Sequence, residues 1–540
     1  MPPMRSRGRS RGWGALIRPG AGGLLLALAF PPWGLWPLVF AAWVPLWVDL
    51  EARARSGDAG WRRTFLCGWV MGFVAFAAIL YWILGLSNEE VTIPGLMLPA
   101  LALLALYVAL FFGAAAALSS WISRRTGAPL LLLAPAITLF FEWLRGQGPL
   151  GFPWGAPAYA LARVTPLLQP AAATGFWGLV FLVLLVNALL GAFLCGRRLG
   201  LPIALALLAV WWIQGEGVLS RHPEGSAAEG RRPLKVLVAQ PDIRREVKWK
   251  PEHRGEVIAS VMSHARAAAA RGDAGGGFDL LVWPETVFPV VLMQDPNLRP
   301  QVEAFVDSIG RPVLLGTQEI TWPIREGRRE FAYYNSALVL GPGADYSPLY
   351  RKIKLVPFSE RMPLQQLFPW LTQIDFGQSN FSAGEEPVLF TVGGEQAGCL
   401  ICFESVFPEL SAEMIRGGAS LLVNITNDFW FGRTAAPIQH AEMAILRAVE
   451  NRVPLVRCAN TGVSFVVDPW GRVREERPMF VAADFVATVA CGAGSFSARH
   501  PDWIRWPWLA WIAAAVAIGF VRGSARPAGR RAEREEERSR

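Results

Sequence analysis

Residues 175–213, GFWGLVFLVLLVNALLGAFLCGRRLGLPIALALLAVWWI, contain two long apolar runs separated by the basic pair Arg197 and Arg198. A helix needs about 20 predominantly apolar residues to cross the hydrocarbon core of a bilayer, and the runs Gly175–Phe193 and Leu199–Ile213 approach that length. The first 215 residues contain no lysine and repeat this pattern several times. We therefore expect the N-terminal part of the chain to lie in a membrane.

The composition of the whole chain also favours a membrane protein. Of its 540 residues, 53% are hydrophobic and only 18% are charged, whereas about a quarter are charged in an ordinary soluble domain. The 52 basic residues exceed the 43 acidic ones by nine, but the arginines of the N-terminal part lie in short breaks between apolar runs, so nucleic acid is not an expected partner. Six scattered cysteines exclude a disulfide scaffold, and five histidines without HExxH spacing give no zinc motif.

Hydropathy predicts seven spans before a central polar region and an eighth after it. The last span follows a tryptophan-rich approach that suits the edge of a bilayer. The predicted spans are Gly20–Phe30, Leu35–Leu50, Thr64–Leu84, Ile93–Leu118, Pro129–Trp143, Gly175–Phe193, Leu199–Ile213 and Trp506–Val521.

The arginines predict the orientation of these spans. Arginine clusters precede the first span and follow the second, fourth and sixth, and cytoplasmic loops are the ones that retain positive charge. Both termini are therefore expected in the cytoplasm. A signal peptide cleaved near Ala29 is the alternative for the first run, although the Phe-Pro-Pro-Trp after it leads directly into another apolar run. The predicted division is a basic N-terminus (1–19), a membrane domain (20–215), an extracytoplasmic domain (216–501), a final span (502–521) and a charged tail (522–540).

The region 216–501 has the alternating pattern of an α/β domain, because short apolar runs alternate with amphipathic stretches. The predicted strands are Lys235–Ala239, Leu280–Trp283, Pro312–Gly316, Ser336–Leu340, Ala397–Ile401, Leu421–Ile425, Leu455–Cys458 and Ser464–Val467. The predicted helices are Glu252–Arg271, Asn297–Ser308, Pro408–Arg416 and Ile438–Asn451.

Three segments of this domain place a reactive side chain after an apolar strand: LLVWPET with Glu285, YRKIKLVPFSE with Lys352 and Glu360, and CLICFES with Cys402. Open α/β sheets often present catalytic groups at strand ends. A cysteine nucleophile needs a base for its proton and a cation or N–H group for the oxyanion that forms. Glu285 and Lys352 can supply these two roles. Each group alone also has a structural explanation, as a buried thiol, a helix cap or a solvated charge.

Together the three groups resemble the Glu-Lys-Cys triad of the nitrilase superfamily. Joined to the predicted spans, the chain resembles the apolipoprotein N-acyltransferase family over nearly its full length. Three positions depart from the usual family motifs, namely Phe403 for Tyr, Ser359 for Gly and Lys354 for His. The matching motifs are FPPWGLWPL, AILYWILG, EWLRG, GFPWG, VAQPDIRREVKW, WPE, YYNSALVLG, the run from Tyr350 to Glu360, Cys402-Phe403-Glu404, NITNDFWFG and RAVENRVPLVR.

The resemblance implies an α-β-β-α sandwich beside a helical membrane domain in a bacterial inner membrane. It implies transfer of a fatty acyl chain from a phospholipid, with phosphatidylethanolamine as the expected donor, to the α-amino group of the S-diacylglyceryl-cysteine of an apolipoprotein. The route implied is a thioester on Cys402, with ping-pong kinetics and with neither a cofactor nor a metal. The supporting residues implied are Trp249, Asn335, Glu360, Phe403 and Glu404.

Two other functions and three side-chain assignments stay open on the residues alone. A membrane-tethered amidase or amidotransferase would use the same triad, and a transporter or receptor would use the outer domain only to bind. Cys399 and Cys402 form a CxxC pair, but side chains three apart on a strand point to opposite faces. Glu142 and Arg145 are either a structural pair or a contact for lipid headgroups. His440 is either structural or the base of a Cys-His pair.

Overall fold

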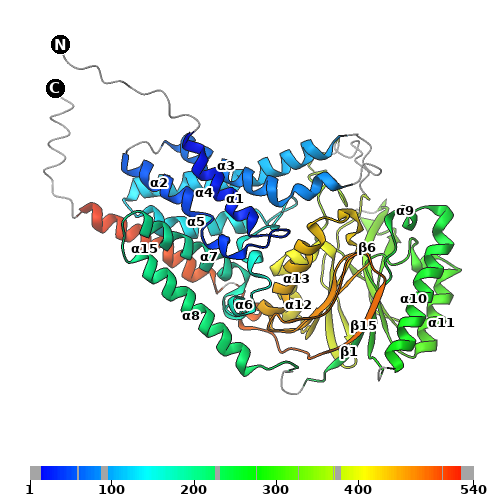
Figure 1. Cartoon of the computed structure of the whole chain (residues 1–540). Helices are drawn as coiled ribbons and strands as arrows, with labels where there is room; N and C mark the ends of the chain where they lie inside the picture. The colour runs from blue at the N-terminus through cyan, green and yellow to red at the C-terminus, as the bar shows by residue number, and fades with distance from the viewer. Residues whose placement is uncertain are drawn as a thin grey trace, which may run out of the picture.

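The computed structural model describes residues 14–56, 60–86, 95–225, 231–274, 277–325, 328–365, 367–368, 370, 379–501 and 503–524. Within them the chain forms a helical part, to which both the first helices and the last helix belong, and an α/β part between them in sequence (Figure 1). The long helix α8 (Gly200–Arg221) leads from one part to the other (Figure 1).

The helical part contains most of the apolar helices that the sequence predicts. Four described helices are long and apolar enough to cross a membrane, and three more contain shorter apolar stretches. The four are α3 (Trp61–Ile79), α4 (Met97–Thr126), α7 (Ala171–Leu194) and α8; the three are α1 (Gly14–Leu28), α5 (Leu130–Leu144) and α15 (Arg505–Ser524).

Two predicted spans are not single helices. Thr64–Leu84 is divided at Leu80 into α3 and the 3-10 helix η2 (Tyr81–Gly85). Leu35–Leu50 consists of the 3-10 helix η1 (Trp36–Phe40) and, after a turn, α2 (Val44–Ser56). Pro37 and Pro45 each lie in the first turn of one of these helices, where a residue without an N–H is tolerated, and neither fits inside a continuous helix. The hydropathy pattern detects the apolar composition but not this break.

Small residues allow the membrane helices to pack closely. On α3, a Cβ added to Gly68 would lie 2.3 Å from the carbonyl oxygen of Phe112 on α4, and one added to Gly72 would lie 2.9 Å from the Cα of Ala109. In a bilayer, close van der Waals packing of this kind replaces the hydrophobic effect as the force between helices. Shorter helical segments η2 (Tyr81–Gly85), η3 (Pro157–Leu161) and α6 (Thr165–Leu168) connect the long ones.

The α/β part is built from two mixed sheets. The first has the strand order β15-β1-β2-β3-β6-β7, with β8 also paired to β6, and the second has the order β14-β13-β12-β11-β10-β9. The strands of the first are β1 (Leu234–Gln240), β2 (Leu280–Val282), β3 (Val313–Thr321), β6 (Ala332–Gly341), β7 (Asp345–Tyr346), β8 (Tyr350–Arg351) and β15 (Ala483–Val489). Those of the second are β9 (Leu389–Val392), β10 (Glu395–Ile401), β11 (Leu421–Thr426), β12 (Leu455–Ala459), β13 (Ser464–Val467) and β14 (Val473–Arg477).

The two sheets lie face to face with helices outside them, so the predicted α-β-β-α sandwich is present (Figure 1). Helices α10 (Arg254–Ala274) and α11 (Leu298–Ile309) cover the first sheet, and α12 (Pro408–Arg416) and α13 (Ala436–Asn451) cover the second. All eight predicted strands and all four predicted helices are present. The strands that the sequence did not predict lie toward sheet edges or are short; β14, for example, reads VREER.

Helix α13 joins the α/β part to the helical part. The amide of Gln439 donates to the carbonyl oxygens of Pro31 and Ile79, at 2.7 and 3.2 Å, and its oxygen accepts from the indole N–H of Trp154 at 2.8 Å. The hydroxyl of Tyr159 donates to the carbonyl oxygen of Val406 at 2.8 Å. The turn that carries Cys402 therefore rests directly on the helical part.

Candidate active site

The three residues predicted to form a triad come together from three strand ends. Glu285 follows β2, Lys352 follows β8 and Cys402 follows β10. The ammonium nitrogen of Lys352 lies 3.7 Å from Oε1 of Glu285, and the Cys402 thiol is close enough for its charged form to interact with both groups. The structure thus assembles the arrangement that the sequence motifs suggested.

Asn335 and Glu360 hold the acid and the lysine in place. The side-chain amide of Asn335, on β6, donates to Oε1 of Glu285 at 2.7 Å and to Oε1 of Glu360 at 3.2 Å. Lys352 donates to the same Glu360 oxygen at 2.8 Å. The other oxygen of Glu285 accepts the backbone N–H of Asn427 at 2.9 Å. Glu285 is therefore oriented by two donors besides the lysine.

Cys402 lies at the start of a strained turn and not inside a strand. Its φ is +51°, in the left-handed region that few non-glycine residues occupy, and it begins the 3-10 helix η7 (Cys402–Val406). Cys399, three residues earlier, is fully buried inside β10. Cys399 is therefore part of the strand, whereas Cys402 belongs to the turn after it. The environments of the two thiols differ for this reason, and not because side chains alternate between the two faces of a strand.

The carboxylate of Glu404 accepts several hydrogen bonds that stabilise this turn. Its buried carboxylate accepts N–H groups from Ile401 and Ile353 at 2.7 Å and from Lys354 at 3.1 Å. The hydroxyl of Tyr350 donates to both carboxylate oxygens at 2.9 Å. The Glu404 side chain thus connects the turn of Cys402 to the loop of Lys352.

Burial and charge set the protonation states of the nucleophile and the lysine. Burial, with the negative charge of Glu285, raises the pKa of the Cys402 thiol well above its usual value, although Lys352 opposes this. Burial also acts to lower the pKa of Lys352, but the carboxylates of Glu360 and Glu285 outweigh it and hold that pKa above its usual value. At neutral pH the site therefore contains a neutral thiol and a positively charged lysine.

The two aromatic candidates, Phe403 and Trp249, have different surroundings. The ring of Phe403 stacks on Phe152 of the helical part, with ring centres 6.2 Å apart, and meets Phe407 edge to face. Trp249 is 37% exposed and directly follows the short helix α9 (Arg245–Lys248). Phe403 therefore packs against the helical part, whereas Trp249 is partly exposed.

A second buried network, which the sequence motifs did not identify, supports the Cys402 backbone. Nε2 of His440 donates to the carbonyl oxygen of Cys402 at 3.1 Å, and Nδ1 lies 2.9 Å from Oδ1 of Asp428. Arg457 donates to Oδ2 of Asp428 at 2.7 Å. The ring of His440 thus contacts the nucleophile's carbonyl group, which disfavours its use as the base of a Cys-His pair.

This network also contains a donor set that suits a metal ion. The thiol of Cys402, an oxygen of Asp428 and a ring nitrogen of His440 lie within 4.8 Å of one another. The guanidinium of Arg457, however, already supplies positive charge to Asp428 and lies 3.1 Å from His440. Burial acts to raise the pKa of Asp428, but Arg457 and His440 lower it to about 2. The carboxylate is therefore neutralised by protein groups.

The structure also assigns the pair Glu142 and Arg145, which the sequence left open. Both side chains are buried, and the guanidinium of Arg145 donates twice to Oε2 of Glu142, at 2.6 and 3.0 Å. The same guanidinium donates to the carbonyl oxygens of Phe152 and Trp154, at 2.6 and 2.9 Å. The pair is therefore internal, and it shapes the loop that touches the nucleophile's turn.

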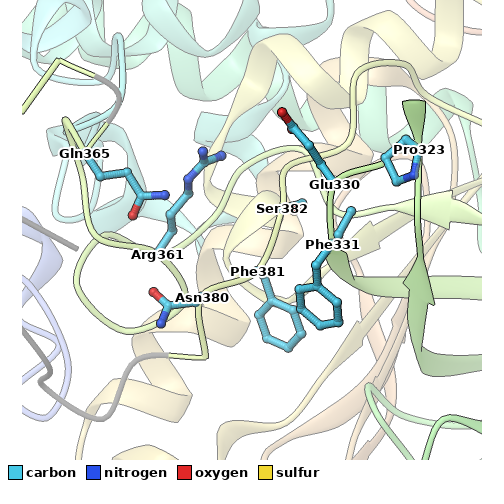
Figure 2. Close-up of a pocket in the computed structure, with 9 residues that line it drawn as sticks. Pro323, Glu330, Phe331, Arg361, Gln365, Asn380, Phe381 and Ser382 are labelled. Atoms are coloured by element: carbon cyan, nitrogen blue, oxygen red, sulfur yellow. The ribbon is translucent and has the colours of Figure 1, made fainter. Parts of the chain in front are cut away.

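A cavity of about 230 Å³ lies next to Arg361, the residue after Glu360. Figure 2 shows Arg361, Gln365 and Asn380 on one side of it and Glu330 and Phe331 on the other. It is lined by Pro323, Glu330, Phe331, Ala332, Arg361, Gln365, Asn380, Phe381 and Ser382. Its wall contains none of the three triad residues, so this cavity is not where they meet.

Comparison with known proteins matches both parts of the chain. Residues 22–189 match the model of the apolipoprotein N-acyltransferase N-terminal domain, and residues 235–481 match that of carbon-nitrogen hydrolases. The apolipoprotein N-acyltransferase of Geobacter metallireducens is 36% identical over 93% of this chain and 94% of its own length. That of Gloeobacter violaceus is 34% identical over 97% of each chain. A nitrilase-superfamily amidase from Nesterenkonia AN1 aligns with 53% of this chain and 100% of its own, at 19% identity and a TM-score of 0.37.

Proposed function

Because this chain belongs to the apolipoprotein N-acyltransferase family, we propose that Cys402 carries the acyl group between the two substrates of that reaction. The chain is a membrane enzyme, and its reaction is the N-acylation of lipoproteins. Its substrates are a lipid and a lipoprotein. The proposal assigns steps of this reaction to individual side chains.

In the first half-reaction, Glu285 takes the proton of the Cys402 thiol while the sulfur attacks the ester carbonyl of the donor. Lys352 stabilises the negative charge that develops on the carbonyl oxygen. When the tetrahedral intermediate collapses, the ester C–O bond breaks and Glu285 returns its proton to the departing alkoxide. A lysolipid leaves and a thioester remains on Cys402.

In the second half-reaction, the α-amine of the lipoprotein attacks the thioester carbonyl. Glu285 accepts the proton that the nitrogen loses as the amide bond forms, Lys352 again faces the oxyanion, and the C–S bond breaks. The thiolate recovers a proton from Glu285, so the enzyme ends as it began. Glu360 keeps Lys352 in place throughout, since it lies 2.8 Å from the ammonium.

The observation that carries this proposal is the orientation of Glu285. One oxygen is held by Asn335 and the other by the backbone N–H of Asn427, and Lys352 lies 3.7 Å away. A carboxylate with fixed geometry beside a buried lysine and a thiol supports acyl transfer through a thioester. A small-amide hydrolase would need the same groups, but it would need neither the helical part nor its contact with the Cys402 turn.

We propose phosphatidylethanolamine as the donor and the outer face of a bacterial inner membrane as the place of reaction. The arginine clusters of the short loops support an outward-facing α/β part and cytoplasmic termini. A membrane-impermeant thiol reagent applied to intact spheroplasts should label a Lys250→Cys variant and not an Arg198→Cys variant. The reverse labelling pattern would overturn the orientation.

Intact-mass analysis of the detergent-purified protein after incubation with phosphatidylethanolamine tests the acyl-enzyme. We expect a fatty-acyl mass increment that hydroxylamine removes. It should be absent from Cys402→Ala and present in Cys399→Ala, a matched control three residues away inside β10. Ammonia release from small amides without any adduct would instead assign the site to an amidase.

A further inference from the structure

A second buried lysine lies near Glu285 without a partner for its charge. Lys248, the last residue of α9, is 1% exposed. Its ammonium makes no hydrogen bond or ion pair with any residue that the structure describes, and its contacts are the rings of Trp249 and Phe429, whose centres lie 5.6 and 5.8 Å away. Lys248 is therefore a buried amine near Glu285 that the proposed mechanism does not use.

Lys352 is as buried as Lys248, but its charge is paired with carboxylates. Lys352 is also 1% exposed, but two carboxylates lie within 3.7 Å of its ammonium. Lys248 has only the more distant charge of Glu285, and burial lowers its pKa to about 7. An unpaired buried ammonium is costly, and groups perturbed in this way concentrate at functional sites. An anion that arrives with a substrate would remove this cost.

The segment before Lys248 is attached to the same loop that orients Glu285. The side chain of Asn460 accepts the N–H of Ile243 at 2.9 Å and donates to its carbonyl oxygen at 2.7 Å. The same Asn460 donates to the side-chain oxygen of Asn427 at 3.0 Å, and the N–H of Asn427 bonds Glu285. Hydrogen bonds thus connect the segment that leads into α9 to the loop that binds Glu285.

One partly exposed ring contacts Lys248, and a second lies against the buried ring on its other contact. Trp249 is 37% exposed, whereas Phe429 is buried and packs at a tilt against Trp430, which is 39% exposed. Aromatic rings of this kind are typical of sites where a protein meets the headgroup region of a lipid. A lipid that enters past these rings would meet Lys248 close to the triad.

We propose that Lys248 binds the phosphodiester of the donor phospholipid and so positions its ester at Cys402. This inference rests on the proposed function. The phosphorus of a glycerophospholipid lies four or five covalent bonds from its ester oxygens, roughly 5 to 7 Å at about 1.5 Å per bond. Lys248 then serves the phosphate while Lys352 serves the carbonyl oxygen, and both amines lie near enough to Glu285 to feel its charge. Lys248 acts by binding and takes no part in the proton transfers.

The test compares a donor that has a phosphate with one that has none. Acyl-enzyme formation on Cys402 is measured by intact mass with dipalmitoyl phosphatidylethanolamine and with p-nitrophenyl palmitate, a neutral ester, in the same detergent. The variant is Lys248→Met, which keeps the length of the side chain and removes the charge. Lys250→Met is the matched control, because Lys250 is exposed and lies two residues away.

We expect Lys248→Met to lower kcat/KM for the phospholipid about tenfold or more, mainly through KM, and to leave acylation by the neutral ester unchanged. The neutral ester also reports whether the variant is folded. An equal loss with both donors, or no loss with either, would overturn the role in phosphate binding. If the native chain forms no thioester with either donor, the acyl-enzyme itself is wrong and this inference fails with it.

Discussion

Chemically identical side chains in this protein have very different surroundings. Cys399 lies inside a strand with no base beside it, whereas Cys402, three residues later, begins a turn where Glu285 and Lys352 meet it. Lys352 is neutralised by two carboxylates, and Lys248 has neither. Reactivity at this site therefore depends on the partners of each residue, which residue type alone does not specify.

The lowered pKa of Asp428 predicts how the stability of the protein depends on pH. Its folded pKa, about 2, is depressed below its usual value of 3.8. The stability it contributes, roughly 2 kcal/mol, is therefore fully present above pH 4 and is lost as pH falls from 4 towards 2. We expect Asp428→Asn to lower the thermal midpoint at pH 6, because buried Arg457 loses its counter-charge. The difference from the native midpoint should shrink below pH 4, and a difference that stays constant down to pH 3 would contradict this assignment.

Among the secondary structure elements, the active site depends on how closely neighbouring strands approach at their ends. The chain after β2 turns directly over β3, and a Cβ placed on Gly316 would lie 2.6 Å from the Cα of Glu285 and from the N of Thr286. These are backbone atoms, so a side chain at 316 cannot be accommodated by a rotamer change. Gly316 is therefore required for the position of Glu285, although it takes no part in the chemistry.

We expect Gly316→Ala to displace Glu285 and to slow acyl-enzyme formation by a factor of about ten to a hundred, since an error of about 1 Å in a catalytic group has effects of this size. The measurement is the rate of the mass increment on Cys402 under single-turnover conditions. Gly255→Ala is the control, because a Cβ at Gly255 meets nothing within 4 Å. Equal rates for Gly316→Ala and the native chain would show that the turn tolerates the shift.

Across the whole molecule, the buried pair Glu142 and Arg145 connects the helical part to the nucleophile. Arg145 holds the carbonyl oxygens of Phe152 and Trp154. Phe152 stacks on Phe403, next to Cys402, and the ring of Trp154 stacks on His440 at 5.7 Å. The strained turn of Cys402 is therefore supported from the helical part as well as from within the sandwich.

The ion pair predicts how single and double substitutions at Arg145 and Glu142 change the stability of the protein. Arg145→Met leaves Glu142 buried without a counter-charge and should destabilise the protein by about 3 to 5 kcal/mol. Adding Glu142→Leu removes the unpaired carboxylate, so the double variant should have a higher thermal midpoint than Arg145→Met alone. Both variants should form the Cys402 thioester more slowly than the native chain. A double variant that is less stable than the single one would contradict the pairing.

Much of this architecture could be predicted from the order of residues along the chain. Apolar runs predicted the helical part, alternation predicted the strands and helices of the sandwich, and motifs at three strand ends predicted that Glu285, Lys352 and Cys402 would meet. These signals are local or depend on short spacings, and a linear sequence preserves both. The break at Pro37 and Pro45 and the edge strands were missed because apolar composition is a weak guide to where a helix or a sheet ends.

Contacts between residues that are far apart in the sequence could be seen only in the folded structure. Asp428, His440 and Arg457 lie on three different elements, Arg145 reaches Cys402 only through rings from two parts of the molecule, and Lys248 is recognised as unpaired only when every neighbour is known. A sequence records which charges exist but not which of them become buried together. Burial determines the free-energy cost of a charge, and an oppositely charged partner determines how much of that cost is offset. Which of these charges are buried and paired could therefore be read only from the packed structure.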